Sequence, residues 1–511
     1  MARSAPPDPL DPALAGLEPH ELWRQFDALR RIPRPSLQEA GVREYLLGLA
    51  ADHGWAALTD ETGNVVLRVP GRGCGTDSAT LAIQGHMDMV CEKLETIAHD
   101  FSRDPIQLRR RVRRIDGREV DVLQAVGTTL GSDNGIGCAT ALALALTPGL
   151  DHPPLELLFT VDEEVGMTGA FGLDPTLVTA RRLINLDAEL EGRIYLSCAG
   201  GRELHARWEL DRDERHNDDV AVRLRVEGLR GGHSGVDIHE GRANALAVLI
   251  GLLTSKEIDL EGVRLATCDG GGRSNAIAAT AQTVLWCASS RVKELGRAFT
   301  LAGERVAEAY AAVDPELQVS FEELDRESRA QTPPPVSSIT SRSILEALRN
   351  MRDGVLTWSP VIDGLVESSN NLGTISTTRG PDGGEMRLVA LTRSSKPGAI
   401  ESYQDRWERT LEASGASVEY QHGFPGWEAR VDTELLRTAQ ASYERLFARA
   451  PILEAIHAGL ECGVLHDRVP GLEMIAFGPD IHDAHTPNES LVIASVVPFW
   501  RFVVQLAADL C

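Results

Sequence analysis

Five side chains that can bind metal ions stand at positions where strands of the chain are predicted to end. They are two histidines and three carboxylates: His86, Asp133, Glu164, Asp187 and His485. None is a thiolate, and such a set can hold two divalent ions if one carboxylate bridges, for which Asp133 is the natural choice. A pair of ions of this kind brings a water nucleophile and a substrate oxygen together. The five residues therefore predict a hydrolytic metal centre.

Two further carboxylates stand beside these ligands in the sequence. Asp88 follows His86 by two residues and can hold the imidazole nitrogen that does not face the metal. Glu163 directly precedes Glu164 and is free to take a proton from a metal-bound water. A single acidic residue at a strand end is more often a helix cap or a solvated loop residue. The repetition of the pattern at five strand ends favours the metal centre.

The segments that must position these residues alternate between strand and helix patterns. Residues 80–84 and 155–161 are apolar runs of strand length, and an Ala/Leu-rich helical pattern that opens at Gly131 separates them. Such alternation predicts an α/β fold with a doubly wound mixed sheet, in which ligands bind outside the carboxyl ends of the strands. The predicted sheet would therefore gather the metal ligands at one edge.

The pattern changes after Gly200-Gly201 to longer alternating strands with helices between them, which indicates an α+β region. A similar order of elements returns after Pro333-Pro334-Pro335, so we expect two ferredoxin-like halves. After residue 423, helical patterns again alternate with an apolar strand, as they do in the first part of the chain. The expected organisation is a catalytic domain at 1–203, an inserted lid domain at 204–423, and the rest of the catalytic domain at 424–511.

The composition argues against several classes of protein. The formal charge of −24 would repel nucleic acid and anionic lipid, so we expect neither nucleic acid nor a membrane as partner. The eight cysteines are scattered, and residues 1–12 lack the build of a signal peptide, which favours a cytoplasmic protein. A Walker A loop, a G-x-S-x-G elbow and an H-E-x-x-H motif are all missing from the sequence.

The Arg-rich segment 103–118 is expected to be a solvated loop.

Four motifs resemble those of a known family. They read GHMDMV at 85–90, GSDNGIG at 131–137, DEEVG at 162–166 and NLD at 185–187. They are similar to the signatures of the cocatalytic zinc peptidases, the family that includes carnosinase, peptidase T and carboxypeptidase G. Within that family, TTLG at 128–131, HAGLECG at 457–463 and the stretch from FGP at 477–479 to HTP at 485–487 resemble the aminoacyl-histidine dipeptidases. The likeness covers nearly the whole chain.

The resemblance implies roles that match those inferred from the residues. His86 and either Glu164 or Asp187 would be terminal ligands, Asp133 the bridge, and His485 a ligand of the second ion. Glu163 would be the general base, with Asp88 beside it among the catalytic residues. The expected cofactors are two divalent metal ions, zinc by default, with manganese and cobalt also compatible with the ligand set.

The resemblance also implies that the lid provides a histidine, which polarises the scissile carbonyl, and an arginine, which binds the substrate carboxylate. His233 lies among glycines and matches the histidine. Arg393 is the candidate for the arginine because a guanidinium fits a carboxylate bidentately, and Arg242 and Arg273 are its rivals. Four more residues are expected to contact substrate, the first two at its amide and the others at its amino end: Asn244, Asn275, His457 and Glu461.

We therefore expect a metal-dependent dipeptidase that cleaves small dipeptides with a free C-terminal carboxylate by a metal-bridging hydroxide. The resemblance alone implies a preference for Xaa-His substrates such as β-alanyl-histidine. An N-acyl amino acid deacylase on the same fold is the alternative. A metal-binding scaffold without catalysis is a third hypothesis, but it assigns no role to Glu163. The sequence leaves open the physiological metal, the choice between monomer and homodimer, and whether the lid histidine serves its own subunit or a neighbour.

Overall fold

The computed structural model describes residues 9–360, 362, 364–378, 383–421 and 423–511 of the 511-residue chain. The N-terminal residues 1–8, part of the segment considered above for a signal peptide, lie outside the described residues. The chain divides into two compact units. Unit 1 comprises residues 1–196, 430–455 and 461–511, and unit 2 comprises residues 197–429 and 456–460.

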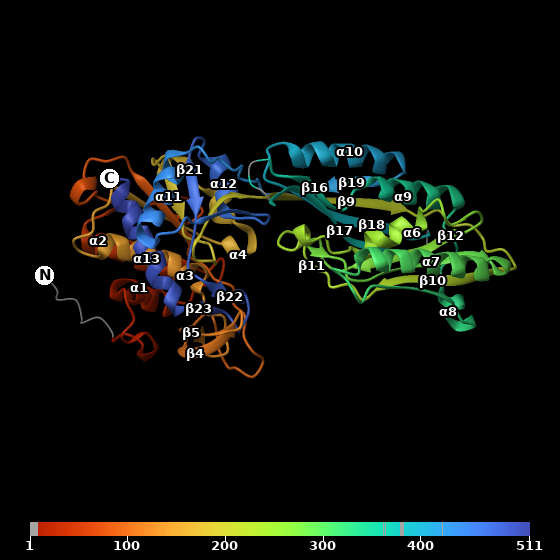
Figure 1. Ribbon diagram of the computed structural model, residues 1–511, viewed down its shortest axis with the longest axis horizontal. Coiled ribbons are helices and arrows are strands. Elements are labelled where there is room, and N and C mark those ends of the chain that lie inside the picture. The colour runs from red at the N-terminus through yellow and green to blue at the C-terminus, as the bar shows by residue number, and fades with distance from the viewer. Residues whose placement is uncertain (1–8, 361, 363, 379–382, 422) are drawn as a thin grey trace. The chain divides into compact units, whose positions relative to one another are not determined.

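The main sheet of unit 1 has the strand order β1-β2-β6-β3-β7-β21-β8-β20 (Figure 1). Its strands are β1 (Ala56–Thr59), β2 (Val65–Val69), β3 (Leu81–His86), β6 (Leu155–Thr160), β7 (Arg182–Asn185), β8 (Arg193–Cys198), β20 (Ile452–Ile456) and β21 (Glu473–Ala476). Strand β3 is parallel to β6 and β7, and β7 is parallel to β21, whereas β1, β2 and β8 pair antiparallel. The predicted mixed α/β sheet is confirmed, and its parallel strands end at a common edge.

Helices of unit 1 pack against this sheet and against one another. They are α1 (His20–Arg30), α2 (Ala40–His53), α3 (Ser132–Leu146), α4 (Glu163–Gly166), α5 (Thr168–Gly172), α11 (Glu434–Phe447), α12 (Glu461–Arg468) and α13 (Ile493–Asp509). Helix α3 is buried along most of its length, which explains its Ala/Leu-rich sequence. One core cluster joins Trp23 of α1, Ile83 of β3, Leu142 of α3 and Phe499 of α13. None of the described helices is long and apolar enough to cross a membrane.

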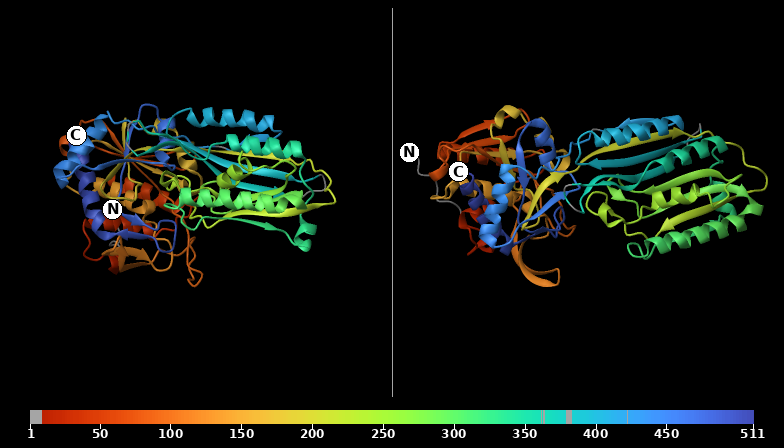
Figure 2. Two further views of the ribbon diagram at one scale, coloured as in Figure 1. Left: turned by 45° about the vertical axis from the view of Figure 1, so that its right-hand side comes forward. Right: turned by 45° about the horizontal axis from the view of Figure 1, so that its top comes forward.

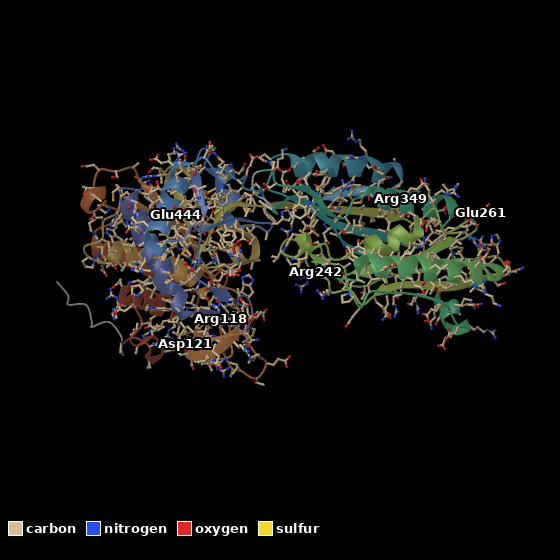
Figure 3. The ribbon with its side chains drawn as sticks, in the orientation of Figure 1. Arg118, Asp121, Arg242, Glu261, Arg349 and Glu444 are labelled. Carbon is tan, nitrogen blue, oxygen red and sulfur yellow. The ribbon has the colours of Figure 1, made fainter. Side chains whose placement is uncertain are left out.

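The Arg-rich segment forms a β-hairpin rather than the expected solvated loop. Its strands are β4 (Leu108–Ile115) and β5 (Arg118–Ala125), which extend a small sheet of order β22-β23-β5-β4. The partners β22 (Ile481–His482) and β23 (Ser490–Val492) flank the segment that carries His485. Arg118 and Asp121 mark this hairpin in Figure 3. Most of the arginines lie in β4, whose residues are half-buried or exposed, whereas residues 122–125 of β5 are buried.

The main sheet of unit 2 has the order β15-β10-β14-β12-β17-β18-β9-β19, with β16 beside β17. The ribbon of this unit, coloured from yellow through green to cyan, is drawn from two further sides in Figure 2. Its strands are β9 (Gly200–Glu209), β10 (Asp219–Glu227), β12 (Arg264–Gly271), β14 (Ala281–Ala288), β15 (Gln318–Glu323), β16 (Gly354–Trp358), β17 (Val366–Thr378), β18 (Glu385–Ser394) and β19 (Ser417–Tyr420). The short strands β11 (Gly232–His233) and β13 (Ala276–Ile277) form a separate pair. The helices are α6 (Ala245–Leu253), α7 (Val292–Tyr310), α8 (Arg326–Gln331), α9 (Ser338–Asn350) and α10 (Ala399–Ala413). Short 3-10 turns in the two units are Pro12–Leu14, Gly73–Gly75, Pro175–Leu177, Ile238–Glu240 and Ser289–Arg291.

Unit 2 contains the two predicted ferredoxin-like halves, in a nested chain order. Elements β10, α6, β12, β14, α7 and β15 follow the β-α-β-β-α-β pattern, and their strands have the spatial order β15-β10-β14-β12. Elements β9, α9, β17, β18, α10 and β19 repeat this arrangement. The halves meet where β12 pairs with β17. Because β9 precedes the whole first half, the second half is interrupted, whereas the sequence suggested two consecutive copies.

Candidate metal centre and active site

The first group of candidate ligands surrounds the end of β3. His86 is the last residue of that strand, and its side chain is fully buried. Its Nδ1 lies 3.2 Å from Asp88 Oδ1, and its Nε2 lies 3.0 Å from Asp133 Oδ1 and 3.3 Å from Asp187 Oδ1. The contact with Asp88 fixes the orientation of the ring, so that Nε2 faces the carboxylates. Asp187 reaches this group because it follows β7, the parallel neighbour of β3.

The second group shares Asp133 with the first. His485 Nε2 lies 3.1 Å from Asp133 Oδ2 and 3.0 Å from Glu164 Oε2. The two carboxylate oxygens of Asp133 thus face two different histidines, which is the arrangement that a bridging ligand requires. Atoms of each group, His86 with Asp133 and Asp187, and Asp133 with Glu164 and His485, lie within 4.8 Å of one another. The structure brings all five predicted ligands together within unit 1.

The electrostatics of this cluster fit divalent cations. Burial raises the pKa of Asp187 to about 6, and the charge of Asp133 adds to that increase. Burial also raises the pKa of Glu163 well above its ordinary value, against the opposing charge of His86. The Oε1 atom of Glu164 is buried and accepts no hydrogen bond from any described residue. Acidic groups packed this closely need positive charge to remain ionised, and the nitrogen and oxygen donors suit divalent metals.

Asp88 contacts residues of both ligand groups. Its Oδ1 accepts a hydrogen bond from the Glu163 N–H at 3.1 Å, and its Oδ2 accepts one from the Glu164 N–H at 3.2 Å. The Ser36 hydroxyl donates to the same Oδ2 at 2.7 Å. Although burial opposes ionisation, the hydrogen bond with His86 lowers the pKa of Asp88 to about 2. One ionised carboxylate therefore orients a candidate ligand and the backbone that carries the candidate base.

His233 of unit 2 has a defined tautomer. Its Nδ1 accepts hydrogen bonds from the N–H groups of Gly235 at 3.2 Å and Val236 at 3.1 Å. Burial, followed by the charge of Arg393, lowers the pKa of His233 below its ordinary value. A neutral ring that accepts at Nδ1 must carry its proton at Nε2. His233 therefore presents a neutral N–H donor, which is the form needed to polarise a carbonyl oxygen.

Arg393 differs from its two rivals in its charge environment. Its side chain on β18 is 5% exposed, and its guanidinium forms no hydrogen bond or ion pair with any other described residue. Burial lowers the pKa of Arg393 to about 10, so the group stays charged at neutral pH. Arg242, labelled in Figure 3, instead pairs with Asp237 and Glu240, and Arg273 is exposed. A buried cation that lacks a counter-charge in its own unit is suited to bind an anionic ligand.

Further polar side chains lie next to Arg393 in unit 2. Ser369 is opposite Arg393 across β17 and β18, and its Oγ lies 2.7 Å from His457 Nε2. Burial lowers the pKa of His457 to about 3, so that the ring is neutral. Its Nδ1 is buried and has no hydrogen-bond partner in the described part of the chain. The sequence predicted His457 but not Ser369, because a serine inside a strand carries no distinguishing signal.

The other residues predicted to contact substrate are Asn244, Asn275 and Glu461, and they differ in burial and in hydrogen-bond partners. Asn244 caps α6 through its Oδ1, and its Nδ2 donates to Asp353, Asn371 and the Leu372 carbonyl. Both ends of its amide are thus engaged inside unit 2. Asn275 is exposed, and its carbonyl accepts a hydrogen bond from the Ser234 N–H. Glu461 belongs to unit 1, where its buried carboxylate accepts hydrogen bonds from Gln84 and Thr160. Burial raises the pKa of Glu461 to about 8.

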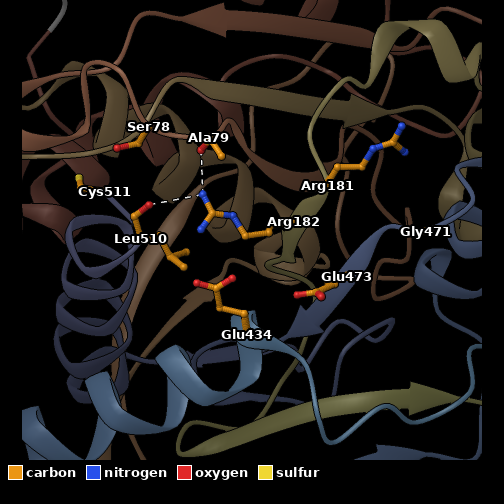
Figure 4. A pocket seen from close by; sticks show the side chains of 9 residues that line it. All are labelled: Ser78, Ala79, Arg181, Arg182, Glu434, Gly471, Glu473, Leu510 and Cys511. Atoms are coloured by element: carbon orange, nitrogen blue, oxygen red, sulfur yellow. Dashed lines mark hydrogen bonds between the residues drawn. The ribbon is translucent and has the colours of Figure 1, made fainter.

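A pocket of about 500 Å³ lies elsewhere on unit 1 (Figure 4). Residues that line it include Arg182, where β7 begins, and Glu473, where β21 begins. The candidate ligands lie beyond the opposite ends of the parallel strands. None of the lining residues belongs to the metal-ligand groups found among the described residues. This pocket is therefore separate from the candidate site.

A sheet edge that holds two ligand groups around a shared carboxylate, with another carboxylate beside them, defines a metal-dependent hydrolase. Residues 82–509 match the sequence model of peptidase family M20/M25/M40, and the chain belongs to this family. It is 34% identical to the cytosol non-specific dipeptidase of Escherichia coli strain K12 over 503 residues, which are 97% of this chain and 99% of that protein. The predicted membership of a metallopeptidase family is confirmed.

Solved structures agree with this assignment. The crystal structure of aminoacylhistidine dipeptidase from Vibrio alginolyticus matches with a TM-score of 0.88 and 33% identity, over 97% of each chain. The aminopeptidase PepT from Bacillus cereus ATCC 10987 matches with a TM-score of 0.53 and 14% identity, over 97% of this chain and 99% of that one. The second likeness shows the fold alone.

Removal of divalent metal is expected to lower the melting temperature of the protein. Ions that bind the folded centre and not the unfolded chain stabilise the fold by about 4 kcal/mol when free metal exceeds the Kd by about a thousandfold. For a domain of 150–250 residues that change corresponds to about 8–16 °C, and the larger unit 1 should lie at the lower end of this range. Calorimetry before chelation, after chelation and after restoration of zinc measures it. An unchanged melting temperature, in protein that elemental analysis shows to have lost its metal, would contradict the expectation.

Proposed function

We propose that this protein is a dipeptidase whose centre holds two divalent metal ions. The observation that carries the proposal is the shared carboxylate of Asp133, whose two oxygens lie 3.0 Å and 3.1 Å from the Nε2 atoms of His86 and His485. His86 and Asp187 would hold one ion, Glu164 and His485 the other, and Asp133 both. Zinc is the first choice, and manganese or cobalt fits the same donors.

Each residue of the proposed site has a distinct task. Bound ions would supply the Lewis acidity that makes water nucleophilic near neutral pH and polarises the scissile carbonyl. Glu163 would accept the proton of the attacking water and return it to the leaving amine, since its raised pKa suits both transfers. Asp88 would hold the Glu163 backbone in place through the hydrogen bond at 3.1 Å.

Unit 2 would act as a lid that supplies the contacts to substrate. The Nε2–H of His233 would donate to the carbonyl oxygen as negative charge develops there. Arg393 would bind the C-terminal carboxylate. His457 was expected at the amino end of the substrate, but it contacts Ser369 opposite Arg393, so we propose that both residues lie beside the carboxylate instead. We propose domain limits close to those expected, with catalytic parts at 1–203 and 424–511 and the lid at 204–423.

The relatives support a dipeptide as substrate. One is named a cytosol non-specific dipeptidase and the other an aminoacylhistidine dipeptidase, and each covers nearly the whole chain. We propose that small dipeptides with a free carboxylate are cleaved, Xaa-His among them, and that the protein acts in the cytoplasm. The charge of the unpaired guanidinium of Arg393 explains why the free carboxylate would be required.

A substrate panel tests the proposed function. It contains β-alanyl-histidine, glycyl-histidine and alanyl-alanine, their C-terminal amides, and N-acetyl amino acids, assayed after chelation and again with zinc, manganese or cobalt restored. We expect hydrolysis of the free dipeptides alone, and only with metal present. Cleavage of the acetylated compounds alone would assign the chain to the deacylases, and a panel without any cleavage would overturn the proposal.

A further inference from the structure

Glu489 connects two segments of unit 1 that are far apart in the sequence. It lies four residues after His485, and its side chain is 3% exposed. Its Oε2 accepts hydrogen bonds from the N–H groups of Leu130 at 2.7 Å and Gly131 at 3.0 Å. Its Oε1 accepts them from the Ser132 N–H at 2.8 Å and the Ser132 hydroxyl at 2.6 Å. These donors are the residues that lead directly into Asp133.

The backbone that Glu489 binds lies at the start of α3, where Asp133 and Asn134 have non-helical φ and ψ angles. The first N–H groups of a helix have no partner within the helix, and they attract negative charge. In this unit they are buried, so the carboxylate of Glu489 satisfies donors that water does not reach. The Asp133 N–H also points to Oε1, at 3.4 Å. The carboxylate therefore fixes the position of the bridging candidate relative to the segment that carries His485.

The two ligand groups depend on this contact to different degrees. His86 lies in β3 and Asp187 follows β7, so the paired strands hold both of them. His485 lies in a loop, its side chain is 53% exposed, and its backbone has a φ of 63°, a conformation that costs energy in a histidine. On the outer side, Arg113 donates to Ser490 Oγ and to Asp483 Oδ2, both at 2.6 Å. Glu489 is the inner attachment of the same loop.

We propose that Glu489 is a positioning residue that sets the separation of Asp133 and His485 and thereby the affinity of the second metal position, formed by Asp133, Glu164 and His485. This inference rests on the proposed metal centre. A purely structural role would weaken both metal positions alike, whereas this inference predicts different losses of affinity at the two positions. Both positions include Asp133, but paired strands hold His86 and Asp187, so that position should lose less affinity than the position that contains His485.

The test compares Glu489→Gln with the wild-type protein and with Glu444→Gln, a matched change at an exposed residue of α11 that is labelled in Figure 3. Zinc is titrated into chelated protein, and bound metal is counted by elemental analysis at each free concentration. The glutamine amide would turn an N–H group toward backbone donors, so we expect the second ion to bind about 10–100 times more weakly. The first ion should be weakened much less than the second, and the Glu444→Gln protein should bind both ions as the wild-type protein does.

Two further measurements separate positioning from folding. Excess zinc should restore the turnover of Glu489→Gln, since the second position then refills, whereas a protein damaged in its fold would not recover. If Glu489→Gln does not fold, Ser132→Ala removes only the hydroxyl donor at 2.6 Å and should weaken the second ion in the same direction. If the second ion bound the variants as tightly as it binds the wild-type protein, the inference would be overturned. A wild-type protein that binds no pair of ions would instead overturn the proposed function.

Discussion

Glu163→Gln is expected to reduce kcat for dipeptide hydrolysis by about a hundredfold to ten-thousandfold, while both metal ions remain bound. The change keeps the size and the backbone hydrogen bond to Asp88 at 3.1 Å, but an amide cannot accept the proton of the attacking water. Burial raises the pKa of Glu163, so the native carboxylate is suited to hold that proton and release it. Steady-state kinetics and elemental analysis of the purified variant measure the two outcomes.

Glu164→Gln provides the matched comparison, because the two residues are neighbours in α4 but have different proposed tasks. Glu164 lies 3.0 Å from His485 Nε2, and its substitution should weaken metal binding. Glu163 also belongs to a possible ligand group with His86 and Glu164. If Glu163→Gln lost an ion, Glu163 would be a ligand rather than a base, and full activity in that variant would exclude it from both roles.

Three of the candidate ligands, His86, Glu164 and Asp187, could be predicted from the sequence because they end or follow parallel strands of one sheet. The expectation of a strand end was wrong for the other two, since Asp133 lies in α3 and His485 lies in a loop between β22 and β23 of the smaller sheet. Apolar runs such as β3 and β6 mark buried strands, and the carboxyl ends of such strands lie at one edge. Polar residues that directly follow the runs must then be neighbours in space. His86 and Asp187, about a hundred residues apart, lie within 3.3 Å for this reason.

The supporting residues could not be predicted because their partners are backbone atoms or lie in distant segments. Ser36 and Glu39 match the pattern of a capping box, but Ser36 donates to Asp88, and Glu39 accepts from the Leu37 and Asp162 N–H groups. Glu489 binds the backbone of Leu130 to Ser132, more than 350 residues away. A contact with the backbone N–H groups of a distant segment leaves no pattern in the sequence.

The sequence did not predict the nested chain order of unit 2, because that order also depends on a contact between distant segments. Strand β9 pairs with β18 along its whole length, although the entire first half lies between them in the chain. Local patterns identify the strands, but they do not state which strands pair across so long a separation. The second half was therefore expected to begin after the proline run, when its first strand is Gly200–Glu209.

Arg393→Met is expected to reduce kcat/KM for free dipeptides by about 10–150-fold, with little effect on the corresponding amides. A hydrogen bond between charged groups contributes about 1.5–3 kcal/mol, and each 1.4 kcal/mol is a factor of ten. Methionine fills much of the same space but cannot bind a carboxylate. The selectivity for free over amidated substrates should therefore fall toward one, and Arg273→Met, a change at an exposed arginine, should keep it.

The same variant should be no less stable than the wild-type protein, and this combination distinguishes a substrate-binding role from a structural one. Arg393 is 5% exposed and its guanidinium has no ionic partner among the described residues, so folding must desolvate most of this side chain without a counter-charge inside unit 2. Burial lowers the pKa of Arg393 to about 10, which reflects that cost. Replacing the charge with an apolar side chain removes the cost, and the free energy of unfolding should hold or rise while activity falls. A loss of both stability and activity, with unchanged selectivity for the free carboxylate, would show that Arg393 supports the lid and does not bind substrate.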